Sequence, residues 1–178
     1  SIRFDLISDD AITDLVAEGV DIAFRLGELR DSRLMAKKLG EAPQVLWASP
    51  EYIARHGAPQ TVEDIVNHNA VVFRHTRQTI WDLRRENEHF EARVDGPFRA
   101  SSGETLLEAA AGGLGILLAP AWLASECFGD QRLVRVLPEW QGPSLPIHAV
   151  WTSGKLRGKA RLFVEHIEPA IAHACSMA

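Results

Sequence analysis

The sequence has little cysteine, no metal-binding motif and no long apolar run. Cys127 and Cys175 are far apart and outside any CxxC pattern, which argues against a disulfide framework or a thiolate metal site and fits a reducing compartment. The seven histidines form no HExxH motif, so no metal is expected. No apolar segment approaches the roughly 20 residues of a membrane-spanning helix, and "SIRFDLISDD" does not read as a secretory leader. We therefore expect a cytoplasmic protein that does not contact a membrane.

Catalytic motifs are also lacking. The sequence contains no GxSxG, no P-loop and no GxGxxG, because the glycines of "GGLGIL" have the wrong spacing. The paired carboxylates of Asp9 and Asp10 fall in the first turn of a predicted helix, where the helix dipole accounts for them. The sequence therefore predicts no catalytic residue and no cofactor.

Positive charge is in deficit. The 178 residues carry a net charge of −5, whereas nucleic-acid-binding domains usually present a basic patch. This chain is therefore not expected to bind DNA by itself, and the basic stretch "KLRGKAR" favours the solvated start of a helix. Hydrophobic residues make up 46% of the chain, enough for the core of one large domain or of two smaller lobes.

Hydrophobic periodicity and turn residues predict a mixed α/β fold. Residues 2–6, 8–19 and 20–27 read as strand, helix and strand, a βαβ unit typical of parallel sheets. The later strands are predicted at residues 34–40, 43–49, 70–75, 80–85, 90–96, 97–101, 115–120, 132–137 and 147–151. The later helices are predicted at residues 49–57, 61–68, 101–112, 120–129 and 159–174, with a kink or early stop at Pro169.

The strands at 80–85 and 90–96 form a predicted hairpin. Two stretches with loop chemistry, residues 40–44 and 141–146, flank a central block of the chain. A chain that leaves one lobe, builds a second and returns would show this organisation.

Polar residues follow several predicted strands, at the point where a helix begins. In open α/β sheets, ligands bind beyond the carboxyl ends of strands, where helix N-termini favour anions. The serines have an alternative role as helix caps, and Ser101 with Glu104 has the spacing of a capping box. Arg25 and Arg74 follow apolar runs, and each has a surface salt bridge as its alternative.

Several spaced segments resemble the co-inducer-binding domain of LysR-type transcriptional regulators. They are "ISDDAITDLVAEGVDIAFRLGEL", "VLWASPEYIARHGAPQTVEDIVNH", "SGETLLEAAAGGLGILLAPAWLASE", "RLVRVLPEW" and "IHAVWTSGKLRGKARLFVEHI". The resemblance covers nearly the whole chain. It implies two Rossmann-like lobes of periplasmic binding protein type 2 architecture, joined by two crossover segments. Lobe I would comprise residues 1–43 and 145–178, and lobe II residues 44–144.

The resemblance also implies a function and a set of partners. An N-terminal winged helix-turn-helix would bind DNA, and it is absent here together with the first strand and helix of lobe I. The chain would bind a small organic acid or aromatic effector between the lobes, with Trp47, Trp81 and Phe24 nearby, and would form a homodimer or homotetramer. The solute-binding protein of a transporter, and an enzyme on the same scaffold, are the alternatives.

Nine residues are predicted to hold the effector, by anion capture or by forming the wall of the site. They are Ser8, Arg25, Gly27, Ser49, Arg74, Ser101, Ser102, Thr105 and Pro120.

Overall fold

The computed structural model describes residues 3–8, 14–29, 34–74, 79–124, 131–152 and 154–176. The chain divides into two compact units, referred to below as unit 1 (Ser1–Ala42 with Leu145–Met177) and unit 2 (Pro43–Ser144). Both passages of the chain between the units run inside strands, β2 (Met35–Ala48) and β9 (Gln141–Trp151).

The loops predicted at residues 40–44 and 141–146 are therefore wrong, and so is the division of β2 into two short strands. In β9, Gly142 is a packing residue, because a Cβ there would lie 3.0 Å from Leu118 Cδ2. In β2, Gln44 pairs with Pro120 on the neighbouring strand, and its side-chain amide donates to the Pro143 carbonyl at 3.0 Å. Glycine and proline are usually associated with turns, and for that reason the sequence predicts loops here. In the fold they lie within strands, where neighbouring segments pack closely.

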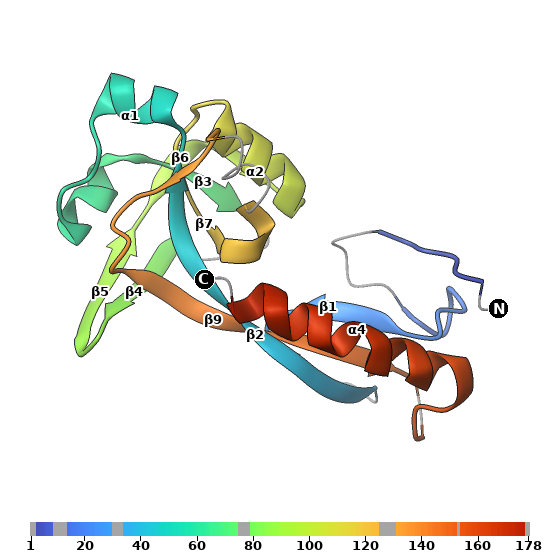
Figure 1. Cartoon of the computed structure of the whole chain (residues 1–178). Coiled ribbons are helices and arrows are strands. Elements are labelled where there is room, and N and C mark those ends of the chain that lie inside the picture. Colours follow the sequence, from blue (N-terminus) through green and yellow to red (C-terminus); the bar gives the residue numbers. More distant parts are fainter. Residues whose placement is uncertain are drawn as a thin grey trace. The chain divides into compact units, whose positions relative to one another are not determined.

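The central strands of unit 2, which are the second half of β2 with β3 and β7, are buried on both faces, whereas β6 alternates between exposed and half-buried residues; Figure 1 shows these strands side by side. β2 runs antiparallel to β7 (Ile116–Pro120), and β7 runs parallel to β3 (Asn69–Phe73), which runs parallel to β6 (Asp95–Ala100). Side chains alternate between two hydrophobic clusters: Leu46 belongs to one, and its neighbours Val45 and Trp47 belong to the other. Burial on both faces explains the continuous apolar runs of the sequence.

Helices cover these strands. α2 (Gly103–Ala111) places Leu106 and Ala110 in the same cluster as Trp47 (Figure 1). α1 (Pro50–His56) and the 3₁₀ helix η1 (Val62–Asn67) contribute Tyr52 and Ile65 to the other cluster. Short helical segments of this kind suffice because tertiary burial, more than intrinsic propensity, stabilises them.

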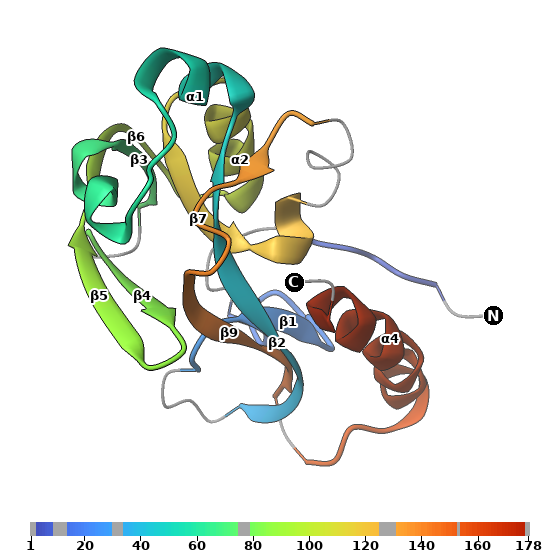
Figure 2. The same ribbon diagram turned by 60° about the vertical axis from the view of Figure 1, so that its left-hand side comes forward.

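The predicted hairpin is confirmed (Figure 2). β4 (Ile80–Arg85) and β5 (Glu88–Arg93) pair antiparallel, and Glu86 in the intervening turn has a φ of 50°. Leu83 and Ala92 are fully buried in the cluster that contains Tyr52. β4 also pairs with β9 through Arg84 and Gln141.

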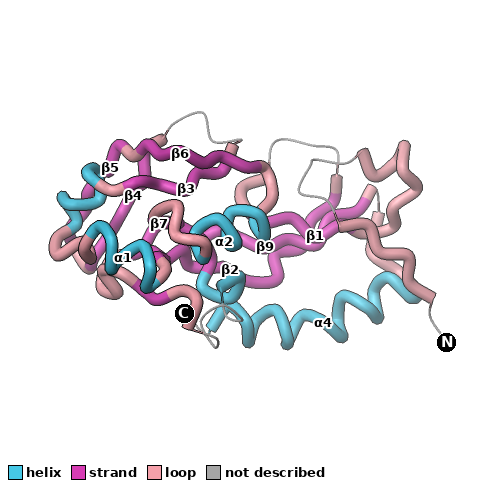
Figure 3. The backbone as a smooth tube through the Cα atoms, turned by 90° about the horizontal axis from the view of Figure 1, so that it is seen from above, coloured by secondary structure: helices cyan, strands magenta, loops and turns pink. Residues whose placement is uncertain are grey.

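Unit 1 combines β1 (Ala23–Leu26), part of β9 and the long helix α4 (Gly158–Ser176), which is drawn as a continuous helix in Figure 3. α4 continues past Pro169 to Ser176, so the predicted early stop is wrong. β1 pairs antiparallel with β9, with Arg25 opposite His148. The predicted parallel βαβ unit is therefore not found in the described part of the first 27 residues.

Four further predictions about local structure differ from the fold. The alternating residues near the N-terminus form no strand over residues 3–8, since no strand among the described residues pairs with them, and Leu6 is 88% exposed. Within the predicted helix 8–19, residues 15–19 form turns, residues 8 and 14 have no regular structure, and residues 9–13 lie outside the described residues. The helix predicted at 120–129 is a 3₁₀ turn, η2 (Ala121–Ala124), as far as the structure describes it, and β8 is only Val134–Arg135.

Candidate functional site

The carboxyl ends of three parallel strands meet at one edge of unit 2. β3, β6 and β7 end at Phe73, Ala100 and Pro120. The Arg74 N–H donates to the Ala100 carbonyl at 2.7 Å, which brings the Arg74 backbone beside Ser101. The structure thus gathers residues that are up to 46 positions apart in sequence, from Arg74 to Pro120, at what we call the carboxyl edge. The predicted site residues on it are Arg74, Ser101, Ser102, Thr105 and Pro120.

Ser102 is the N-cap of α2. Its backbone is extended, with φ −105° and ψ 130°, and its hydroxyl accepts from the Thr105 N–H at 3.4 Å. The predicted capping box of Ser101 and Glu104 is therefore wrong by one residue, because the helix begins at Gly103. Ser101 is exposed and is left outside the cap.

The start of α2 packs closely against the segment that follows β7. A Cβ on Gly103 would lie 3.3 Å from Leu123 Cδ2, so glycine permits this approach. Pro120 is buried at the end of β7 and is followed directly by η2. These two residues shape the edge by packing, while the N-terminus of α2 offers backbone N–H groups and a partial positive charge.

Trp122 is a residue of this region that the sequence reasoning missed. Its indole Nε1 is buried and has no hydrogen-bond partner among the described residues. A buried N–H of this kind costs free energy unless a partner satisfies it. The sequence "PAW" could have indicated it, because it places an aromatic residue with a hydrogen-bond donor directly after the end of a predicted strand.

Ser49 lies at the opposite edge of the same sheet. β2 runs antiparallel to β7, so its end is next to the start of β7, and a Cβ on Gly113 would lie 3.6 Å from Ser49 Oγ. Ser49 is 1% exposed and accepts from the Tyr52 N–H at 3.1 Å. It therefore caps α1, as its sequence context predicts, and the structure does not bring it together with Arg74.

The remaining three predicted site residues belong to unit 1. Arg25 lies within β1, and Gly27 follows that strand with a φ of 97°, its N–H donating to the Pro146 carbonyl at 2.8 Å. Positive φ at this position favours glycine. Ser8 is exposed and outside any regular element.

The aromatic residues expected near the effector have packing roles. Trp47 is 3% exposed in one hydrophobic cluster of unit 2, and Trp81 packs against the other. Phe24 is 40% exposed in unit 1 and meets the Phe163 ring edge-on, with centroids 6.1 Å apart.

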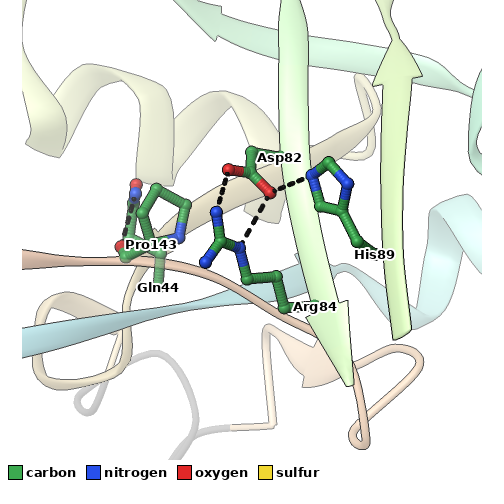
Figure 4. Close-up of polar contacts among 5 residues, drawn as sticks. All are labelled: Gln44, Asp82, Arg84, His89 and Pro143. Carbon is green, nitrogen blue, oxygen red and sulfur yellow. Dashed lines mark hydrogen bonds and ion pairs between the residues drawn. The ribbon is translucent and has the colours of Figure 1, made fainter. Parts of the chain in front are cut away.

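A second polar group, on the hairpin, is satisfied internally (Figure 4). Asp82 accepts from Arg84 Nε at 3.2 Å and Nη2 at 2.9 Å, and it lies 2.8 Å from His89 Nε2. The Arg84 hydrogen bond is the main reason that the pKa of Asp82 is below its usual value. These side chains neutralise one another and leave no unpaired charge for a ligand.

The described residues contain no group of three or more histidine, cysteine, aspartate or glutamate side chains placed to hold a metal ion. Within the same part of the chain, no helix is long and apolar enough to cross a membrane.

Comparisons with known proteins identify the family. Residues 1–172 match the model of the LysR substrate binding domain. The chain is 35% identical to the HTH-type transcriptional regulator DmlR of Escherichia coli, over 93% of this chain and 54% of that protein. It is 33% identical to an uncharacterised HTH-type transcriptional regulator of Haemophilus influenzae, over 80% of this chain and 50% of that protein.

Solved structures agree with this assignment. The regulatory domain of CrgA from Neisseria meningitidis has a TM-score of 0.75 at 30% identity, over 88% of this chain and 78% of that chain. The regulatory domain of AphB from Vibrio vulnificus has a TM-score of 0.68 at 31% identity, over 90% of this chain and 80% of that chain.

The chain is an α/β regulatory domain with the periplasmic-binding-protein-like fold of these neighbours. It belongs to the LysR substrate binding domain family. The chain spans about half the length of the curated relatives it matches.

Proposed function

We propose that this domain senses a small organic acid or aromatic metabolite and thereby controls a LysR-type transcriptional regulator. The observation that carries the proposal is the carboxyl edge of unit 2. There, the Arg74 backbone lies beside Ala100, and Ser101 leads into the N-terminus of α2. A guanidinium, two hydroxyls and a helix N-terminus suit a carboxylate, which accepts hydrogen bonds and carries negative charge.

The effector would occupy the cleft between the two lobes, with Arg25, Gly27 and Ser8 of unit 1 as the expected partners across it. Binding would act by population shift: an effector that contacts both lobes binds their closed arrangement better and increases its population. The domain would act in the cytoplasm as part of a homodimer or homotetramer. DNA would be bound only through a separate helix-turn-helix, and no cofactor is required.

The proposal can be tested by a melting-temperature screen of the full-length protein against succinate, citrate, benzoate and salicylate, followed by calorimetry with the acid that stabilises most. Removing a charged hydrogen-bond donor should weaken binding about tenfold or more in Arg74→Gln. Ser102→Ala should weaken it less, because the hydroxyl is also the cap of α2.

Arg84→Gln is the matched control, since it removes one positive charge of the same unit from the internally satisfied hairpin. Unchanged affinity in both Arg74→Gln and Ser102→Ala would show that the carboxyl edge is not the effector site. Equal losses in Arg74→Gln and Arg84→Gln would show that only the overall charge matters.

A further inference from the structure

Unit 2 contains a hollow of about 640 Å³ that the effector proposal does not use. It is lined by residues at the amino ends of β3 and β6, where Asn69 and Asp95 are register partners, and by Thr79 and Arg93 at the base of the hairpin. Arg74 follows the other end of β3, so the hollow and the carboxyl edge lie at opposite ends of these strands. Its volume is in the range of small-molecule sites.

The charges that line the hollow do not cancel. Arg99 Nη2 is 3.1 Å from Asp95 Oδ1, so these two side chains form an ion pair. Arg93 also lines the hollow, and no ion pair joins it to another residue in the part of the chain that the structure describes. One positive charge therefore remains, on a guanidinium whose planar donors match the oxygens of a carboxylate or phosphate.

The neutral lining side chains of Asn67, His68, Asn69 and Thr79 can also donate hydrogen bonds. The buried Tyr52 hydroxyl accepts from the Asn69 N–H at 3.0 Å and lies 3.1 Å from His68 Nδ1. Because desolvation by burial lowers the pKa of His68, the ring is neutral near pH 7. Because the Tyr52 hydroxyl already accepts from Asn69, we assign its own proton to the bond with His68 Nδ1. In that tautomer the proton of the neutral ring is on Nε2, which can donate to a ligand.

We propose that this hollow is a second ligand site, which binds a small oxyanion with two negative charges, such as phosphate or a dicarboxylate. Arg93 supplies a positive charge that forms no ion pair within the described residues. His68, Asn67, Asn69 and Thr79 are the neutral groups available to hydrogen-bond the remaining oxygens. Among the described residues of the lining, Asp95 is the one carboxylate, and it is paired with Arg99, so a cation finds no equivalent partner among them.

The test uses the full-length protein and two probes, inorganic phosphate and succinate, titrated by calorimetry at constant ionic strength. Arg93→Gln should weaken the binding of the preferred anion about tenfold, as expected for loss of a charged hydrogen-bonding partner. Arg84→Gln removes the same charge from the paired face of the hairpin and should change the affinity by less than about twofold. Comparing phosphate with succinate distinguishes the two kinds of oxyanion.

A second readout reports on the hollow directly. Long-range ¹H–¹⁵N spectra should show the His68 proton on Nε2 and a shift of that signal when the anion is added. The absence of heat and of spectral change with both anions, up to about 20 mM, would overturn the proposal, as would equal losses in Arg93→Gln and Arg84→Gln.

Arg74→Gln separates this site from the effector site. Binding that survives Arg74→Gln and is lost in Arg93→Gln supports the hollow. Binding that is lost in Arg74→Gln and survives Arg93→Gln would overturn this proposal and leave the proposed effector site supported.

Discussion

Units 1 and 2 differ in how they bury apolar side chains. Unit 2 has two large hydrophobic clusters on the two faces of its strands, whereas the cluster of unit 1 has three buried members, Leu39, Ala149 and Val164. Most of the large apolar residues that are exposed belong to unit 1, including Phe4 at 64% and Leu162 at 60%. Hydrophobic stabilisation scales with buried apolar area, so it is concentrated in unit 2.

This difference has a functional consequence. The carboxyl edge and the hollow both lie on unit 2, where packed strands and α2 hold their backbones in place. A site on a rigid, well-packed scaffold keeps its geometry at low energetic cost. In unit 1, by contrast, the rings of Phe4 and Phe24 stay exposed and pack on Phe163 of α4, Phe4 at a tilt of 49° and Phe24 edge-on.

Replacing one buried leucine of each unit with alanine should give the largest difference between the units in lost stability. Leu46→Ala opens a cavity in a fully buried cluster of unit 2 and should cost about 2–5 kcal/mol. Leu39→Ala acts in the small cluster of unit 1 and should fall at or below the lower end of that range, because the surrounding groups can collapse or admit water. Urea denaturation followed by circular dichroism measures both. Equal costs would remove the energetic distinction between the units.

Replacing one glycine of each unit with alanine should give a smaller difference in lost stability than the two leucine variants. A Cβ on Gly96 would lie 1.9 Å from the Ala70 carbonyl oxygen, so the backbone of β3 or β6 must shift, and the cost should be about 1–3 kcal/mol or more. Gly154 has a φ of 67° and open space around it, so Gly154→Ala should cost only the left-handed backbone penalty of about 1 kcal/mol. Thermal melting of both variants is the measurement, and a larger loss in Gly154→Ala would contradict the model of tight packing in unit 2.

The sequence predicts unit 2 better than unit 1, for the same physical reason. A strand buried on both faces has a continuous apolar run, and the serine before Pro50 marks the start of α1 unambiguously. Residues 2–6 have the alternation of a strand, but alternation cannot supply the neighbouring strand that its hydrogen bonds need. The antiparallel pairing of β1 with β9 depends on residues more than 120 positions apart, which local patterns do not encode.

The carboxyl edge could be predicted in part. The positions of Arg74 and Ser102 after strands follow from the parallel arrangement of β3 and β6. Local propensity could not decide between Ser101 and Ser102 as the cap, because both precede acceptable first-turn residues. Nor could it show that Ser49 lies at the other edge, since that placement depends on the antiparallel pairing of β2 with β7.

Alanine at the two caps of unit 2 distinguishes a structural serine from a ligand-binding one. Ser49→Ala leaves the buried Tyr52 N–H without its acceptor and should cost about 1–2 kcal/mol, without changing effector affinity. Ser102→Ala loses a longer, less buried bond and should cost about 0.5–1 kcal/mol while weakening the effector. Melting temperature and calorimetry on the same samples provide the comparison. A loss of affinity in Ser49→Ala alone would reverse the two assignments.

Acidification should cause the smallest change in the free energy of unfolding, and it should act mainly on unit 2. The pKa of Asp64 is lowered chiefly by the Thr61 and Gln60 N–H groups, that of Asp95 by the Gly96 N–H and Arg99, and that of Glu108 by Arg132. A carboxyl whose folded pKa is below its unfolded value stabilises the fold above the unfolded pKa. That contribution is lost as the pH falls through the folded pKa, below about pH 4.

These carboxylates are solvent-exposed, and the surrounding water weakens their interactions, so the loss should be modest. Unfolding free energies measured between pH 7 and pH 3 should fall less steeply in Asp64→Asn than in the unmodified protein, because the amide does not titrate. Identical pH dependence in the two proteins would mean that the capping carboxylate of η1 contributes nothing to the acid sensitivity of unit 2.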